Sequence, residues 1–136
     1  MGILIDASVL IDAERGNLDL ASRIKGREEE EFYLSVITAS ELLHGVWRAA
    51  DSKVRTKRSA FVEAILERFS ILSIDLSVAR IHAQLWAELS TKGIPMGPHD
   101  TWLSAICIAH GYTLVTGNIR EFKKVPGLIV ENWANH

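Results

Sequence analysis

The stretch Gly2-Ile3-Leu4-Ile5-Asp6 joins a short apolar run directly to an acidic residue. Similar apolar runs occupy residues 32–36, 71–74 and 113–115, and a weaker one occupies residues 128–130. Short apolar runs separated by helical sequence are typical of parallel strands that are buried on both faces. The pattern predicts an α/β fold with three layers, in which a central, mostly parallel sheet of four to five strands is flanked by helices.

Helical periodicity predicts helices over residues 8–14, 18–25, 38–50, 54–69 and 76–91. The third and fourth of these helices form a hairpin that breaks near Asp51. Asp75 is a suitable N-cap for the fifth helix. Pro98 fits the first position of a sixth helix, where the missing N–H costs nothing. We expect a single domain over residues 1–136.

The composition is that of a globular protein, with 48% hydrophobic and 24% charged residues in 136. The single cysteine, Cys107, lies in an apolar segment and has no internal disulfide partner, which fits a reducing compartment. Zinc spacing of Cys and His is absent, and so is an apolar run long enough for a membrane helix. We therefore expect a cytoplasmic protein that does not associate with membranes.

Three acidic residues occupy equivalent positions in this pattern. Asp6 ends the first strand, while Glu41 and Asp100 are expected to open helices. Thr116 and Asn118 close the fourth strand. In open α/β sheets, ligands bind outside the carboxyl ends of the strands, and Mg²⁺ prefers oxygen ligands together with substrate phosphate. The pattern therefore predicts metal-assisted hydrolysis of a phosphodiester.

Each acid also has a purely structural interpretation. Glu41 completes a capping box with Thr38, and Asp100 complements the helix dipole in a first turn. Asp6 is harder to explain in this way, because aspartate is depleted in strands. Glu121, three residues beyond Asn118, could reach the same site.

The expected hairpin carries a cluster of basic residues close to Glu41 in sequence. The cluster consists of Arg48, Lys53, Arg55, Lys57 and Arg58. The net charge of the whole chain is only −2, which argues against nucleic-acid binding over the entire surface. Local arginines and lysines beside an acidic site could nevertheless position RNA phosphates. The alternative is that the hairpin is charged simply because it is solvated.

Four blocks of sequence occur in a recognisable order over nearly the whole chain. They are ILIDAS at 3–8, SVITASEL at 35–42 followed by Gly45, DTWLSA at 100–105 leading to HGYTLVTGN at 110–118, and EF at 121–122 followed by VPGL at 125–128 and ENW at 131–133. These blocks resemble PIN-domain nucleases, most closely the VapC-type toxins of prokaryotic toxin–antitoxin pairs.

The resemblance implies a PIN-like fold and an endoribonuclease that depends on Mg²⁺, with Mn²⁺ able to substitute. It implies that Asp6, Glu41 and Asp100 hold the metal, with Glu121 as a fourth candidate, and that Thr116 and Asn118 orient water or the ligands. It also implies a homodimer, a cognate antitoxin that binds the acidic groove in a higher assembly, and an RNA substrate. Two positions depart from the family pattern, with Ala7 in place of Thr and Glu121 in place of Asp.

Other functions are compatible with parts of the pattern. A PIN-like module that binds RNA or protein without cleaving would be expected to have lost one of the three acids. A nuclease of RNA processing, rather than a toxin, would retain them all. A phosphatase of the haloacid-dehalogenase type would need an acid at position 8, where Ser8 stands, and a receiver domain would need a lysine after the fourth strand.

Overall fold

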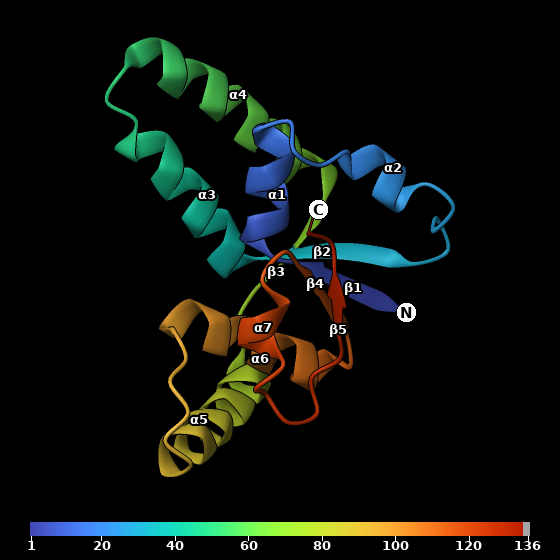
Figure 1. Cartoon of the computed structure of the whole chain (residues 1–136), viewed down its shortest axis with the longest axis vertical. Helices are drawn as coiled ribbons and strands as arrows, with labels where there is room; N and C mark the ends of the chain where they lie inside the picture. Colours follow the sequence, from blue (N-terminus) through green and yellow to red (C-terminus); the bar gives the residue numbers. More distant parts are fainter. Residues whose placement is uncertain (135–136) are drawn as a thin grey trace.

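The structure, a computed structural model, describes residues 1–134. One or two helices separate each strand from the next along the chain, as the sequence predicted (Figure 1). The elements in chain order are β1 (Gly2–Ile5), α1 (Ala7–Glu14), α2 (Leu20–Ile24), β2 (Glu31–Ser35), α3 (Val36–Arg48), α4 (Ser52–Arg68), β3 (Ser70–Leu72), α5 (Leu76–Thr91), α6 (Pro98–His110), β4 (Thr113–Thr116), α7 (Ile119–Phe122) and β5 (Val130–Asn132).

The sheet has five parallel strands in the order β3-β2-β1-β4-β5. The first strand lies at its centre, since Leu4 is paired with Tyr33 of β2 on one side and with Leu114 of β4 on the other. The residues that follow β1 therefore emerge at the middle of the carboxyl edge. This is the switch point at which open α/β sheets bind ligands.

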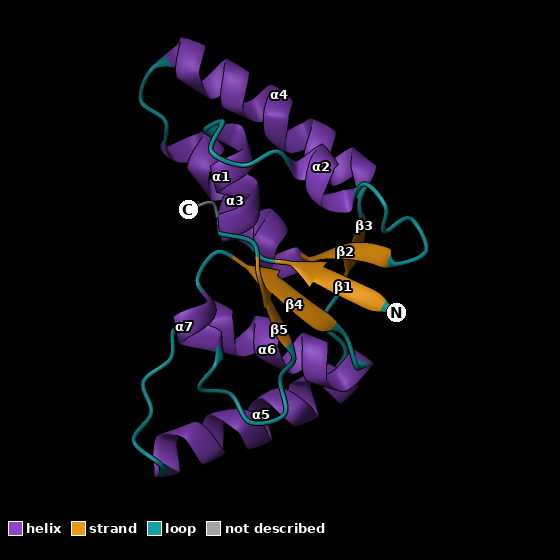
Figure 2. Cartoon of the chain, turned by 45° about the vertical axis from the view of Figure 1, so that its right-hand side comes forward, coloured by secondary structure: helices purple, strands orange, loops and turns teal. Residues whose placement is uncertain are grey.

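Helices cover both faces of the sheet (Figure 2). Alternate residues of β1 point to opposite faces, so Ile3 and Ile5 pack in one core with side chains of α1, α3 and α4. Leu4 packs in the other core with side chains of α5, α6 and α7. The three-layer α/β prediction is confirmed. Among residues 1–134, no helix is both long and apolar enough to cross a membrane.

Some boundaries differ from the sequence prediction for local reasons. Helix α3 begins at Val36 because the Ser35 hydroxyl accepts a hydrogen bond from the Thr38 N–H at 3.0 Å and caps the helix. The alternative interpretation of Glu41 as part of a capping box with Thr38 is therefore wrong, and Glu41 lies in the second turn instead of at the expected helix start. Pro98 is the first residue of α6, as predicted, and His99 follows it in the first turn.

Close packing of an aromatic ring against β1 occurs at the amino-terminal end of the strand, opposite the carboxyl edge. The ring of Tyr112 stacks on Tyr33 and on His110, with ring centroids 5.1 Å apart in both pairs. A β-carbon at Gly2 would overlap the Tyr112 ring. Gly2→Ala should therefore lower the free energy of unfolding by about 1–3 kcal/mol, which urea denaturation measures.

Gly45→Ala is the matched control for this substitution. Gly45 lies inside α3, and a β-carbon there would meet no atom closer than 3.9 Å. Alanine in a helix interior should raise the free energy of unfolding by about 0.5–1 kcal/mol. Equal stability of Gly2→Ala and the wild-type protein would contradict the close packing of β1 on Tyr112.

Candidate functional site

Asp6 lies at the centre of the carboxyl edge and is only 6% exposed. Its backbone N–H donates to the Val115 carbonyl at 2.9 Å, which fixes Asp6 between β1 and β4. Its side-chain oxygen Oδ2 accepts two hydrogen bonds of 2.8 Å, one from the Ser8 hydroxyl and one from the Thr116 hydroxyl. The first predicted acid is thus buried and held from two sides.

Glu41 reaches the same edge from the second turn of α3. Burial raises the pKa of this carboxyl, and the negative charge of Asp6 raises it further. The imidazole of His99 opposes both effects, since its Nδ1 lies 3.7 Å from Oε2 of Glu41. Glu41 and Asp6 therefore interact electrostatically, although they come from different layers.

Asp100 lies in the first turn of α6. Burial raises its pKa to about 6, and the charges of Asp6, Glu41 and Glu121 contribute in the same direction. A helix N-terminus ordinarily favours an ionised carboxylate, so the interpretation of Asp100 as a simple dipole partner does not account for this shift. The neighbouring acids and the burial outweigh the helix end.

Glu121 joins the acidic group from α7, a four-residue helix that the sequence did not predict. Its charge acts on Asp100, while its own Oε2 lies 3.4 Å from Nζ of Lys124. The structure therefore places Asp6, Glu41 and Glu121 within electrostatic range of Asp100, and Asp6 within range of Glu41. They come from the end of β1 and from α3, α6 and α7.

The donor set suits a hard divalent cation, because it consists of carboxylate oxygens whose repulsion a cation would relieve. Within residues 1–134, however, the side chains do not form a ready-made cluster of three or more Asp, Glu, His or Cys groups around one ion position. The assignment of Asp6, Glu41 and Asp100 as metal ligands remains a prediction, and so does that of Glu121.

The predicted polar residues after β4 differ in their roles. The Thr116 hydroxyl is buried and bonds directly to Asp6. Asn118 is exposed, and its backbone N–H donates to the Thr116 hydroxyl at 2.9 Å. Two residues of the site were not predicted. Ser8 is part of the pattern Asp-X-Ser at a strand end, which is visible in the sequence. Lys124 lies three residues beyond Glu121 on the following turn.

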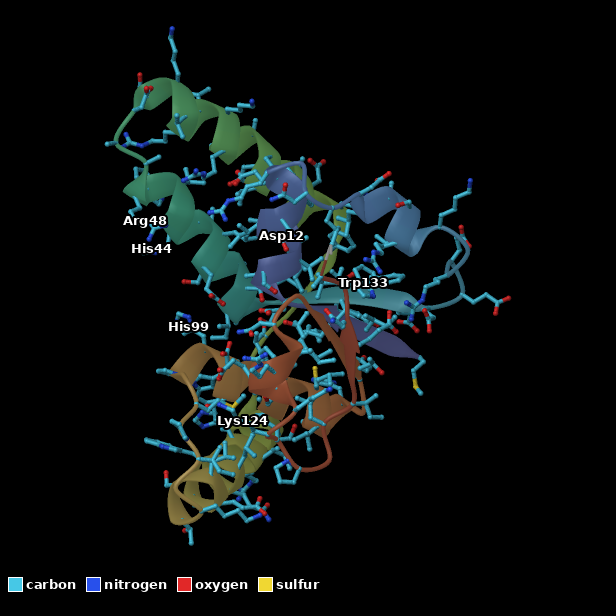
Figure 3. The ribbon with its side chains drawn as sticks, in the orientation of Figure 1. Asp12, His44, Arg48, His99, Lys124 and Trp133 are labelled. Carbon is cyan, nitrogen blue, oxygen red and sulfur yellow. The ribbon has the colours of Figure 1, made fainter. Side chains whose placement is uncertain are left out.

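The basic cluster divides into two groups. Arg55 and Arg58 turn back onto α3, donating to the carbonyls of Ala49 at 2.6 Å and Gly45 at 3.0 Å. Arg48, Lys53 and Lys57 are exposed. Figure 3 shows Arg48 and His44 along one side of α3, with His99 at the start of α6 near the other end of that helix. The exposed cations therefore lie at the end of the α3–α4 hairpin that is farther from Glu41.

A cavity of about 110 Å³ opens between α1, α3 and α4 beside Glu41. Apolar side chains line it together with three arginines and two glutamates, and Arg58 pairs with Glu14 at 3.5 Å, so Arg15 and Arg48 remain to meet acidic groups beside an apolar side chain. The lining residues are Leu10, Ile11, Glu14, Arg15, Glu41, Leu42, His44, Gly45, Arg48, Arg58, Phe61 and Val62.

Comparison with known proteins agrees with this geometry. The family model described as the PIN domain matches residues 3–128. Ribonuclease VapC1 of Rickettsia felis is 35% identical over 130 residues, which cover 96% of this chain and 95% of the relative. The tRNA(fMet)-specific endonuclease VapC of Salmonella typhimurium is 36% identical over 101 residues, which cover 74% of each chain.

A solved structure shares the whole fold. A chain in the crystal structure of VapBC2 from Rickettsia felis, bound to a DNA fragment from their promoter, superposes with a TM-score of 0.89. It is 27% identical, and the match covers 98% of this chain and 99% of that chain. The chain therefore belongs to the PIN-domain family and, within it, to the VapC-type proteins.

The raised pKa of Asp100 predicts that its charge destabilises the fold. For a carboxyl whose pKa rises on folding from 3.8 to about 6, the penalty is complete above pH 6 and disappears as the pH falls towards 3.8. Asp100→Asn should thus raise the free energy of unfolding at pH 7.5 by roughly 1 kcal/mol, after allowance for solvent screening. The gain should be smaller at pH 4.5. Urea denaturation in EDTA at both pH values measures it.

Asp75→Asn is the control of opposite sign. The Val78 N–H and the Ser77 hydroxyl donate to Asp75 and lower its pKa, so the ionised form stabilises the fold. The amide should therefore lower the stability at pH 7.5. An Asp100→Asn protein that is no more stable than wild type at this pH would show that the acidic edge carries no electrostatic penalty.

Proposed function

We propose that this protein is an endoribonuclease that depends on a divalent cation and acts as the toxin of a toxin–antitoxin pair. The observation that carries the proposal is the acidic group at the carboxyl edge of the sheet, in which Asp6, Glu41 and Asp100 repel one another and Glu121 acts on Asp100. Membership of the VapC-type proteins supports the choice of RNA, because two relatives are named as a ribonuclease and a tRNA endonuclease.

The proposed roles follow from the position of each side chain. Asp6, Glu41 and Asp100 hold Mg²⁺, or Mn²⁺ in its place, with Glu121 at the rim beside Lys124. When bound, the ion supplies a Lewis acid that lowers the pKa of water and neutralises charge on a phosphate. Thr116 orients Asp6 through its hydroxyl, and Asn118 orients Thr116 through its backbone N–H. A catalytically silent module would have no use for this acid group.

The RNA backbone is proposed to lie along the side of α3 that carries the exposed cations. Arg48, Lys53 and Lys57 offer positive charge there without being tied to neighbouring carbonyls, as Arg55 and Arg58 are. Their charges offset the repulsion between phosphates and the acidic edge. Contacts of this kind position the strand and carry no sequence information.

The proposed antitoxin surface overlaps that of RNA. The cavity beside Glu41 would receive an apolar side chain of an antitoxin, whose acidic neighbours would pair with Arg15 and Arg48 and block the edge. A homodimer is proposed on the outer face of α3, where Trp47 is 75% exposed near Val36 and Leu43. The solved VapBC2 structure, with DNA from their promoter, supports a higher assembly.

Cleavage of RNA by purified, antitoxin-free protein tests the proposal. Transfer, ribosomal and messenger RNAs, with the initiator tRNA among them, should yield discrete fragments in Mg²⁺ and none in EDTA. Asp6→Asn should lower the rate by about 100-fold or more, because even partners that only support a metal ligand are worth 10–100-fold. Denaturing gel electrophoresis of end-labelled RNA gives the rates.

Glu67→Gln serves as the control, since Glu67 is exposed on α4 and carries the same change of charge. It should cleave at the wild-type rate. Equal cleavage by Asp6→Asn and wild type would overturn the assignment of the acidic edge. Activity that persists in EDTA would overturn the role of the cation.

The exposed cations give a separate prediction for binding. The triple variant Arg48→Gln, Lys53→Gln and Lys57→Gln should weaken RNA binding and reduce the slope of log K against log salt by about 2, since each lost phosphate contact is worth roughly 0.7 for a single strand. Fluorescence anisotropy at several salt concentrations measures this slope.

The control triple variant replaces Lys25, Arg80 and Lys92 with Gln. These residues are exposed in the turn after α2, on α5 and in the turn after α5, and the net charge changes by the same amount. It should retain the wild-type slope. The same loss in both variants would mean that total charge, and not the hairpin, governs RNA binding.

A further inference from the structure

The carboxylate of Asp6 does not cap α1, although Asp6 stands at the N-cap position of that helix. Asp6 is the N-cap residue of α1 and has the extended backbone of a cap, with φ −72° and ψ 150°, yet its side chain makes no cap hydrogen bond. An aspartate in this position ordinarily accepts from a backbone N–H of the first turn and stabilises the helix by about 1 kcal/mol. Here that stabilisation is forgone, so the carboxylate is directed elsewhere.

The chain contains the same local pattern at a second helix start. Asp75-Leu76-Ser77 precedes Val78 of α5 in the way that Asp6-Ala7-Ser8 precedes Val9 of α1. In α5, Oδ1 of Asp75 accepts from the Ser77 hydroxyl at 2.9 Å and also from the Val78 N–H at 3.0 Å. In α1 the Ser8 bond is kept, but the cap bond is replaced by a bond from Thr116. The two sites thus differ in what the carboxylate faces.

The direction of each hydroxyl proton at Asp6 is set by the loop after β4. The Gly117 N–H donates to the Ser8 oxygen at 3.0 Å, and the Asn118 N–H donates to the Thr116 oxygen at 2.9 Å. A backbone N–H can only donate, so each hydroxyl oxygen is an acceptor on the loop side and each hydroxyl proton is free to point at Asp6. Two parallel relays, each from a backbone N–H through a hydroxyl, converge on one carboxylate oxygen.

Within the described part of the chain, the hydrogen bonds of this carboxylate therefore all go to Oδ2. Two donors that approach Oδ2 from α1 and from β4 fix the carboxylate plane and use the acceptor capacity of that oxygen. The other oxygen, Oδ1, keeps its lone pairs. Hydrogen-bonded carboxylates of this kind are well suited to bind a cation through their remaining oxygen.

We propose that Ser8 is a positioning residue for the cation site, which, with Thr116, saturates Oδ2 of Asp6 and reserves Oδ1 as the single metal-binding oxygen. The inference rests on the proposed function, because it assumes that Asp6 binds the ion. It adds a residue that has no direct contact with the ion and assigns the backbone of Gly117 and Asn118 a part in holding Asp6. A role limited to joining α1 to β4 would leave cation affinity unaffected.

Titration of the full-length, RNA-free protein with Mn²⁺, followed by the loss of the free-ion signal in electron paramagnetic resonance, tests this role. Ser8→Thr and Ser8→Val have the same shape and differ only in the hydroxyl. Ser8→Val and Ser8→Ala should bind Mn²⁺ about 10-fold more weakly than wild type, whereas Ser8→Thr should bind more tightly than Ser8→Val. Ser77→Ala, which removes the equivalent hydroxyl in α5, should leave Mn²⁺ affinity unchanged.

The outcomes separate failure of this inference from failure of the proposed function. If wild type and Asp6→Asn bind Mn²⁺ equally, Asp6 is not a ligand and both fall. If Asp6→Asn loses affinity while Ser8→Val matches Ser8→Thr, the cation site stands and the role of Ser8 is overturned. If Ser8→Ala and Ser77→Ala lose stability equally and only Ser8→Ala loses affinity, the positioning role is supported.

Discussion

Repulsion among carboxylates is the main physical constraint at the carboxyl edge of the sheet. The parallel sheet has β1 at its centre, so the elements that follow its strands meet at one edge. They bring together Asp6, Glu41, Asp100 and Glu121. Burial disfavours the charged form of Glu41 and Asp100 and is the main reason that their pKa values rise, and the charges of neighbouring acids raise them further. The fold tolerates this arrangement because an apolar core lies behind each face of the sheet, with Ile3 and Ile5 in one core and Leu4 in the other.

The acids differ in how firmly they are held. Asp6 is anchored by β4 and by two hydroxyls, whereas Glu41 and Asp100 project from helices and are partly open to solvent. His99 and Lys124 place nitrogen groups beside Glu41 and Glu121. The site therefore combines one carboxylate that is held by two hydroxyl groups with others that meet at most one neighbouring cationic side chain.

Much of the fold could be predicted from the sequence, because hydrophobic periodicity and the residues that begin or end helices are local properties. The apolar runs gave the strands, and Asp75 and Pro98 gave two helix starts correctly. The start of α3 was misplaced because the capping hydroxyl of Ser35 lies within what reads as a strand. The pairing of Ser8 with Thr116, 108 residues away, depends on tertiary contacts that no local pattern encodes. The roles of the hairpin arginines could not be predicted either, because the sequence does not distinguish an arginine that binds a carbonyl from one that faces solvent.

The way in which Arg55 and Arg58 fasten α4 to α3 has a mechanical consequence. Glu41 and Arg48 lie on one continuous helix, seven residues and therefore about 10 Å apart along its axis. The geometry of α3 itself fixes this separation, and the hydrogen bonds from α4 brace the C-terminal half of α3. Under the proposed function, α3 therefore sets the distance along the RNA strand between the phosphodiester that is cleaved near Glu41 and the phosphate that Arg48 binds.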